Sequence, residues 1–366
     1  MLGAFPTTAL AGYEDGMDAY RKAWAAYATQ RYDEARRWDK QAIQADPKNP
    51  HAYALAGDLA YLAHDLDGAR KAWEQSLALE PRLRAIMERL SQLAREQALE
   101  TGQVALNTDL FVIRTPAPPP KDLVGGPAGA EIDTPWVLRE LQAAKTFLET
   151  QWQFQLRGPI SVLVYTPEAF YDGFHVPTAV AGLFDGKIRL PVSGRAGARD
   201  LSNDPQRQGG QGQAQQADEV RRATMRPVIW HELTHAAVHQ LTHGRAPRWL
   251  HEGVAQAVEA HVRSIPTEAL QLALRRDAVP ALAKLEGRSG EFGEATPIEA
   301  GVFYQASFAY VAYVLDHRGW AGLHRLLDEV RDGVPTPDAL AHVMGMDERE
   351  WDRESRRWVQ EHFESP

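Results

Sequence analysis

The chain of 366 residues is predicted to be an α+β protein that is mostly helical. Helical periodicity dominates the first hundred and the last hundred residues, whereas short runs rich in β-branched residues occur only in the middle. We expect an N-terminal helical array over 1–100 and a strand with a Pro/Gly-rich linker over 101–130. A lobe with a small mixed sheet then follows over 131–264, and a C-terminal helical subdomain over 265–366.

Composition excludes several classes of protein. The fractions of hydrophobic (44%) and charged (24%) residues are those of a soluble globular protein. The net charge is −9 and no basic stripe is present, so nucleic acid is not an expected partner. No apolar run reaches the ~18 residues of a membrane span. Because the chain has no cysteine, any bound metal has to use histidine and carboxylate ligands.

The first twelve residues, MLGAFPTTALAG, lack the basic start and long apolar core of an intact signal peptide. The small residues of A-L-A-G are typical of a cleavage site, however. Both a cytoplasmic location and export with a signal peptide already removed therefore stay open.

The N-terminal array contains an internal repeat. Two small residues and a proline recur at a spacing of 34 residues: Ala35, Ala42 and Pro47, then Ala69, Ser76 and Pro81. This spacing is typical of tetratricopeptide repeats, in which small side chains let paired helices approach closely. A further helix over about 83–98 is expected to cap the array. Such an array either binds a peptide or protein partner in its groove or acts as a spacer.

The middle of the chain predicts a sheet. Runs over 109–114 and 160–165 are expected strands, and 186–192 alternates polar and apolar residues like a strand with one wet face. A helix should begin with Thr134 as N-cap and Pro135 at its first position. Residues 193–224, rich in Gln and Gly, are predicted to be a flexible loop, which is either a lid or an inert insertion.

A group of polar residues after this loop defines a candidate metal site. His231, Glu232 and His235 form the pattern H-E-x-x-H, which places both histidines on one face of a helix. Two imidazoles at this spacing can bind one cation, with Glu232 close to an attacking water molecule. The segment W-L-H-E-G follows a break containing Gly and Pro and offers Glu252 as a third ligand. Two histidines, one carboxylate and an open position are typical of catalytic zinc.

The segments HELTH and WLHEG resemble those of the gluzincin zinc metallopeptidases. Together with the repeats, they make the chain similar to bacterial proteins that join tetratricopeptide repeats to a peptidase MA-like domain. This resemblance covers nearly the whole chain and implies a thermolysin-like peptidase domain. It implies one zinc ion per chain bound by His231, His235 and Glu252, with Glu232 as general base.

The resemblance implies two further roles. The strand before the zinc helix would bind an extended substrate through Gly186 and Ile188, or it is merely a sheet edge protected by Lys187 and Arg189. Tyr304, in a Y-x-x-S element, would stabilise the oxyanion, or it is an ordinary core aromatic. The glutamate motif with which aminopeptidases hold a free amino terminus is missing, so endopeptidase activity is expected.

Four further polar residues lie in or near the two motifs. Gln256 and Glu259 follow Glu252 by four and seven residues, so either could hydrogen-bond a ligand imidazole or be exposed, and Glu259 is the better charge partner. His239 is rotated by ~80° from the first histidine and cannot share its metal. His251 adjoins Glu252 and should point elsewhere.

The function predicted from the sequence is zinc-dependent hydrolysis of peptide bonds, in which Glu232 moves a proton from water to the leaving nitrogen. The alternative is a repeat-based binding scaffold whose metallopeptidase-like domain is catalytically silent. An enzyme that acts on another amide, such as a cell-wall peptide, also stays open.

Overall fold

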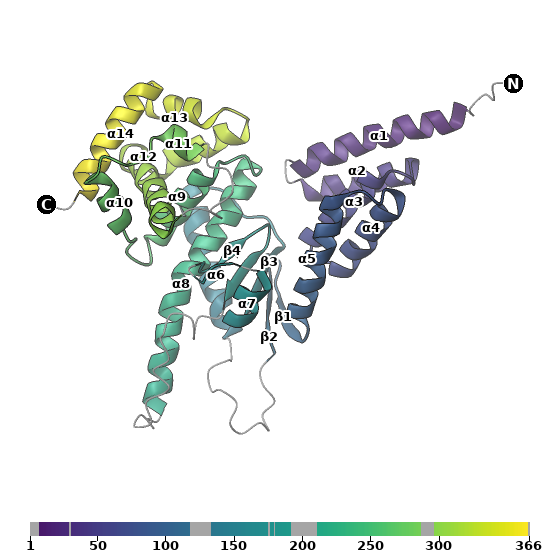
Figure 1. Ribbon diagram of the computed structural model, residues 1–366, viewed down its shortest axis with the longest axis horizontal. Helices are drawn as coiled ribbons and strands as arrows, with labels where there is room; N and C mark the ends of the chain where they lie inside the picture. Colours follow the sequence, from purple (N-terminus) through teal and green to yellow (C-terminus); the bar gives the residue numbers. More distant parts are fainter. Residues whose placement is uncertain are drawn as a thin grey trace. The chain divides into compact units, whose positions relative to one another are not determined.

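The computed structural model describes residues 7–28, 31–117, 133–174, 176–178, 180–191, 211–286 and 296–364. The chain divides into two compact units. Unit 1 comprises residues 1–126 and 159–177, and unit 2 comprises 127–158 and 178–366. Residues 159–177 thus belong to the same unit as the N-terminal helices. The fold is mostly helical with a small mixed sheet, as predicted (Figure 1).

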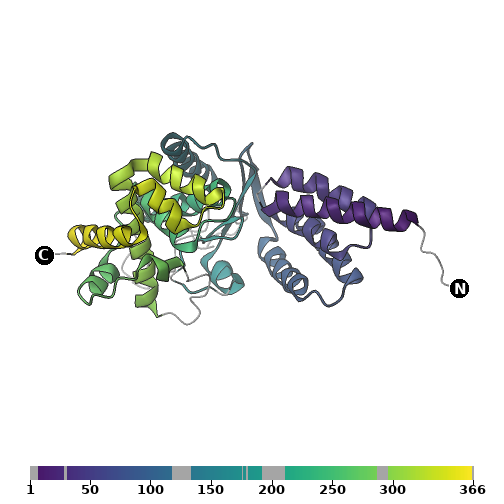
Figure 2. The same ribbon diagram turned by 90° about the horizontal axis from the view of Figure 1, so that it is seen from above.

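Unit 1 begins with five helices that follow one another along the chain (Figures 1 and 2). These are α1 (Thr7–Ala28), α2 (Tyr32–Ala45), α3 (Pro50–Leu62), α4 (Leu66–Leu79) and α5 (Arg84–Glu100). The side chain of Asn49 caps α3 by accepting hydrogen bonds from two backbone amides, and Asp65 caps α4 by accepting one from Gly68. The helical nature of this region and the closing helix after residue 82 are thus confirmed.

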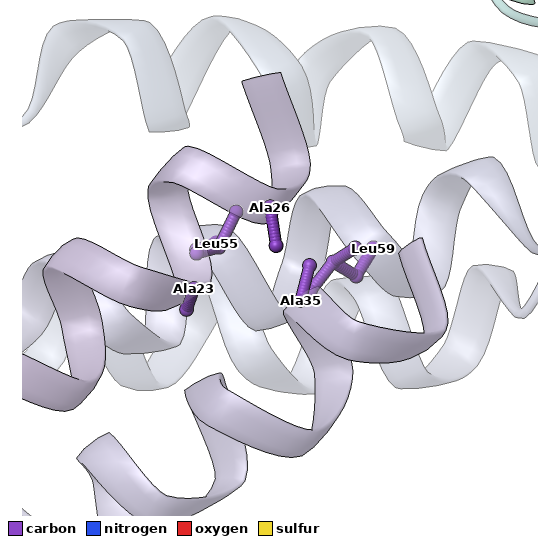
Figure 3. Packing of buried hydrophobic residues seen from close by; sticks show 5 residues of the cluster. All are labelled: Ala23, Ala26, Ala35, Leu55 and Leu59. Atoms are coloured by element: carbon purple, nitrogen blue, oxygen red, sulfur yellow. The ribbon is translucent and has the colours of Figure 1, made fainter. Parts of the chain in front are cut away.

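Small residues let these helices approach closely. Ala23, Ala26 and Ala35 are buried against Leu55 and Leu59, so α1, α2 and α3 share one apolar cluster (Figure 3). At Gly57 of α3, a Cβ atom would lie only 2.2 Å from the indole of Trp73 in α4. That indole donates hydrogen bonds to the carbonyl of Ala54 and to Asp58. The small positions recognised in the repeat are therefore sites of close helix packing.

Unit 1 contains three strands of the sheet, and their pairing is mixed. β1 (Gln103–Asn107) pairs antiparallel with β2 (Phe111–Pro116), and β2 pairs parallel with β3 (Ile160–Tyr165), with Phe111 opposite Ile160. The helix α7 (Pro167–Phe174) follows β3. Every residue of β3 is buried, as its continuous apolar run predicts. The sequence reading missed β1, and it placed β2 two residues too early.

In unit 2, a short hairpin joins β4 (Leu183–Phe184) to β5 (Ile188–Pro191). Its turn contains Gly186 with a φ of 96°, a conformation that glycine adopts without strain. The predicted wet face of this strand is wrong, because the side chains of Lys187 and Arg189 are both fully buried. Arg189 is held by an ion pair with Asp185, with 3.2 Å between Nε and Oδ2.

The helix α6 (Thr134–Trp152) begins one residue earlier than predicted. Its N-cap is Asp133, whose carboxylate accepts a hydrogen bond from the amide of Trp136 at 2.9 Å, so the prediction of Thr134 as N-cap is wrong. A charged carboxylate takes the role expected of the threonine hydroxyl. Along α6, Glu140 forms an ion pair with Arg226 of the next long helix.

That helix is α8 (Gln211–Thr242), and its first part contradicts the predicted flexible loop over 193–224. Residues 211–224 are helical. The start of α8 extends away from the other helices of unit 2 (Figure 1), whereas Arg222 forms an ion pair with Asp133 at the start of α6. Gln and Ala favour helix, which explains why a run of low complexity can continue one. Residues 192–210 lie outside the described part of the chain. Pro227 stands inside α8, just before its buried half.

The rest of unit 2 is helical, as predicted for the last hundred residues. It consists of α9 (Arg248–Glu259), α10 (Glu268–Leu274), α11 (Leu282–Glu286), α12 (Pro297–Arg331), α13 (Thr336–Met344) and α14 (Glu348–Phe363). Gly319 interrupts α12 with a φ of 61°. By length and composition α12 could cross a membrane, a property that it shares with core helices, and much of it is buried within the protein.

Candidate metal centre

The centre is built on the buried half of α8. His231 and His235 are one helical turn apart, with ring centroids separated by 4.7 Å and ring planes nearly perpendicular. This half of α8 lies in the interior of the protein, where Ile229, Leu233 and Val238 are fully buried around the two histidines. The histidines are thus polar groups in an apolar setting, held by packing in fixed directions.

A reversal of the chain brings Glu252 to the two histidines. α8 ends at His243 and Gly244, both with positive φ, and α9 then returns along it. Glu252 Oε2 lies 3.5 Å from Nε2 of His231 and 3.6 Å from Nε2 of His235. One potential ligand atom from each of the three residues lies within 4.8 Å of the other two. The structure therefore brings together the ligands predicted from sequence.

The position of α9 depends on close contact with α12. A Cβ atom at Gly253, next to Glu252, would lie 2.3 Å from the backbone oxygen of Ser307. Only glycine lets the two helices approach this closely. The indole of Trp249 is fully buried and donates a hydrogen bond of 2.7 Å to Glu286 of α11. The W-L-H-E-G segment thus contains both a ligand candidate and the residues that position it.

Glu259 orients one of the histidines. Its Oε2 lies 2.8 Å from Nδ1 of His231, and its other oxygen pairs with Arg263. This contact leaves Nε2 of the imidazole directed at Glu252. Gln256, the other residue predicted for this role, instead donates to the backbone oxygen of Tyr304 at 2.8 Å and contacts no imidazole.

Glu232 is buried beside the histidines with only 5% of its surface exposed. Its Oε2 has no hydrogen-bond partner within the described ranges of the chain. Burial raises the pKa of this carboxyl group, while the neighbouring His235 and His231 act in the opposite direction. Gly182 packs against it so closely that a Cβ atom there would lie 2.5 Å from Oε1. The sequence reading missed Gly182, which no motif marks.

The charges of the pocket favour a cation. Burial alone would lower the pKa of His231, but the carboxylates of Glu252 and Glu259 raise it to about 10. Burial alone would raise the pKa of Glu252, yet His235 and His231 hold it well below its usual range. A buried cluster that stabilises positive charge this strongly has the electrostatics of a cation site.

The distances also fit a tetrahedral ion. Contacts of 3.5 and 3.6 Å are too long for good hydrogen bonds. Two atoms bound to one tetrahedral zinc ion at about 2.0–2.2 Å lie roughly 3.3–3.6 Å apart. The donor set of two imidazoles and a carboxylate is one that zinc accepts. By spacing and by chemistry, the three side chains present fit a zinc ion.

Tyr304 and Arg248 border the centre. Nη2 of Arg248 donates to the Tyr304 hydroxyl at 3.3 Å, and its Nε lies 3.9 Å from Glu252 Oε1. Burial, and then the charge of Glu252, raise the pKa of Tyr304, so its hydroxyl keeps its proton. Arg248 was missed from sequence, although its position four residues before Glu252 is the spacing of a helical ion pair.

Two further histidines lie nearby. The ring of His251 is 5.6 Å from that of His235 and 6.4 Å from that of His239. The ring of His239 also lies 5.5 Å from that of Phe184. Burial lowers the pKa of His239 to about 4 and that of His251 to about 3, so both are neutral at pH 7. Neither belongs to the group of potential ligands. His251 lies closer to the centre than its place beside Glu252 predicts.

The residues predicted to bind substrate lie in the hairpin of unit 2. Gly186 is in the turn, and Ile188 is fully buried opposite Phe184. β4, and not the strand that carries Ile188, is an end strand of the sheet. An extended peptide added to this hairpin would therefore meet the backbone of β4 first.

Residues 218–361 match the model of the Peptidase MA superfamily. No curated protein and no solved structure matches the chain. The matched region contains both motifs of the candidate centre as well as Tyr304. It leaves out the N-terminal helices, so it does not address the tetratricopeptide interpretation. The match supports a metallopeptidase-like domain in this part of the chain.

Proposed function

We propose that the protein is a zinc metallopeptidase that cleaves internal peptide bonds. The observation that carries this proposal is the convergence of His231, His235 and Glu252 at the spacing of a tetrahedral ion. The buried carboxylate of Glu232 lies beside them with one oxygen unpartnered in the described chain. The match to the Peptidase MA superfamily supports the same assignment.

Each residue has a distinct part in the reaction. A zinc ion held by the three ligands would polarise the scissile carbonyl and acidify a water molecule. Glu232 accepts the proton of the attacking water and delivers it to the leaving nitrogen. Its raised pKa suits this exchange, because a carboxylate of ordinary acidity would accept the proton of water less readily. Glu259 holds the His231 ring in the orientation that presents Nε2.

Tyr304 and Arg248 would act on the oxygen of the scissile bond. The carbonyl oxygen gains negative charge when water attacks, and a preorganised donor stabilises it. The Tyr304 hydroxyl keeps its proton and is held by Arg248, so it can donate to that oxygen. An extended peptide that runs along the hairpin around Gly186 and Ile188 would present its scissile bond to this group.

We also propose that α1–α5 form a tetratricopeptide-like array that binds a protein partner or presents substrate. The close packing at Ala26, Ala35 and Gly57 supports this assignment.

The proposed activity is tested with zinc-reconstituted protein in a peptide-library cleavage assay. Glu232→Gln should retain zinc and lose at least about 100-fold in kcat/KM, since it removes the proton acceptor and no ligand. Glu219→Gln, an exposed substitution on the same helix, is the matched control. It should leave both the zinc content and kcat/KM unchanged. Equal cleavage by the Glu232 variant would overturn the mechanism. Zinc binding with no cleavage by any form would favour the alternative of a silent binding scaffold.

A further inference from the structure

A second cluster of potential metal ligands lies within unit 1. His64 is in the connection between α3 and α4, while Glu96 and Glu100 are one turn apart on α5. One ligand atom from each lies within 4.8 Å of the other two. Nε2 of His64 lies 3.0 Å from Oε2 of Glu100. Three groups from two separate segments thus converge on one point.

These groups are buried, which makes their charges costly. The side chains of His64 and Glu100 are 5% and 7% exposed, and Glu96 is 1% exposed. A protonated His64 would supply one positive charge beside these two carboxylates. Buried like charges are tolerated where a counter-charge compensates them. A divalent cation would balance the two carboxylates and leave the imidazole neutral.

Two tyrosines orient the carboxylates. The hydroxyl of Tyr61 donates to Oε2 of Glu96 at 2.6 Å, and that of Tyr165 donates to Oε1 of Glu100 at 2.9 Å. Hydrogen bonds of this kind hold ligating carboxylates in place around metal ions. Tyr165, at the end of β3, also lines a hollow of about 320 Å³ together with Leu99 and Thr101. Tyr165 thus lies between this hollow and the carboxylate of Glu100.

The imidazole of His64 is held in an unusual way. Its backbone has a φ of 59°, the left-handed region that a histidine seldom adopts. Its Nδ1 is buried and has no hydrogen-bond partner among the described residues. The chain therefore accepts backbone strain and an unsatisfied ring nitrogen in order to place this imidazole against Glu100. Such a combination is typical of a functional position.

We propose that His64, Glu96 and Glu100 form a second metal site, which binds a divalent transition-metal ion such as Zn²⁺. One imidazole with two carboxylates suits zinc and its neighbours, whereas Mg²⁺ and Ca²⁺ prefer oxygen ligands alone. The bound ion would join the α3–α4 connection to α5. Its role is structural: it fixes the last helix of the array at the point where the chain enters β1.

The test separates this site from the candidate centre of unit 2. In the full chain, His231→Ala/His235→Ala removes two ligands of that centre and leaves unit 1 intact. After zinc loading and dialysis, mass spectrometry should find about one zinc ion per chain in this variant, and zinc should raise its Tm. Adding Glu96→Gln or Glu100→Gln, which keep an acceptor for Tyr61 or Tyr165, should weaken zinc binding at least about 10-fold.

Matched controls exclude indirect effects. Glu88→Gln changes an exposed carboxylate of α5 and should leave the remaining zinc in place. His64→Asn removes the imidazole with a residue that tolerates the left-handed backbone, and it should also lose the ion. Circular dichroism confirms that each variant is folded.

A His231→Ala/His235→Ala protein that is folded and binds no zinc would overturn the second site and leave a hydrogen-bonded His–Glu pair. It would not affect the proposed peptidase activity, which depends on unit 2. Conversely, a wild-type chain that keeps zinc only through His64, Glu96 and Glu100 would support the second site and refute the first.

Discussion

Nδ1 of His231 lies 2.8 Å from Oε2 of Glu259, which is itself 3% exposed and paired with Arg263. The contact joins α8 to the end of α9 and fixes which ring nitrogen is directed at Glu252. A buried carboxylate in contact with the imidazole of a candidate ligand is a positioning group for that ligand.

The first prediction concerns this contact. Glu259→Gln should lower zinc affinity by about 10- to 100-fold, because the amide orients the ring less well and removes a charge. Chelator competition measures the change. Glu268→Gln, an exposed substitution on α10, should have no effect. Unchanged affinity in the Glu259 variant would show that His231 needs no such partner.

The second prediction concerns Tyr304. Tyr304→Phe removes only the hydroxyl that Arg248 holds, so zinc content and folding should be unchanged. If that hydroxyl stabilises the oxyanion, kcat should fall by about 10²–10³ with little change in KM. Steady-state kinetics on one peptide decide this. If the Tyr304→Phe variant had the kcat of the wild type, Tyr304 would be only an aromatic residue of the core.

The third prediction concerns Gly253. Gly253→Ala places a methyl group 2.3 Å from the Ser307 backbone oxygen, so α9 has to move away from α12. We expect a loss of about 1–3 kcal/mol in the free energy of unfolding together with weaker zinc binding. Gly301→Ala is the comparison, since its methyl group would meet only the Cβ of Ala269, at 3.0 Å. Urea unfolding and zinc titration measure both effects, and equal behaviour of the two variants would refute the close-contact argument.

The fourth prediction concerns pH and Asp39 in unit 1. Asp39 is 3% exposed, and burial, followed by the charge of Asp58, raises its pKa to about 7. The folded state therefore holds a proton that the unfolded chain releases near pH 4, and stability falls as the pH rises from about 4 to 7.

Asp39→Asn should remove this dependence. It should stabilise the protein by about 2–4 kcal/mol above pH 7 and hardly at all near pH 4. Hydrogen exchange of α2 at several pH values provides a local measurement. Asp33→Asn, with a carboxylate that is 95% exposed, is the control. A gain that is equal at both pH values would contradict the raised pKa.

The candidate centre could be read from sequence because its spacing rules are local. Helical geometry places His231 beside His235, and the ligand set also includes Glu252 once a turn follows. The choice between Gln256 and Glu259 could not be made, because it depends on where Tyr304 lies. His251 was misjudged for the same reason: its surroundings come from α8 rather than from its own helix.

The helices of both units were predictable from periodicity and from Gly or Pro boundaries. The strands of the sheet were less predictable from the sequence. The strand β1 is short and mostly exposed, so it lacks the apolar alternation that marks a strand. Lys187 and Arg189 were taken as exposed because charged residues usually are, yet both are fully buried and Arg189 is paired with Asp185. Tertiary partners decide such cases, and a single sequence does not contain them.

The measurement that tests the central claim most directly is anomalous diffraction at the zinc edge from crystals of the zinc-loaded chain. The account predicts a peak within about 2.0–2.2 Å of Nε2 of His231, Nε2 of His235 and a carboxylate oxygen of Glu252. The peak should vanish in crystals of His235→Ala and persist in those of Glu232→Gln. A zinc-loaded crystal without a peak at these three residues would contradict the assignment of a metal centre, and with it the proposed peptidase activity.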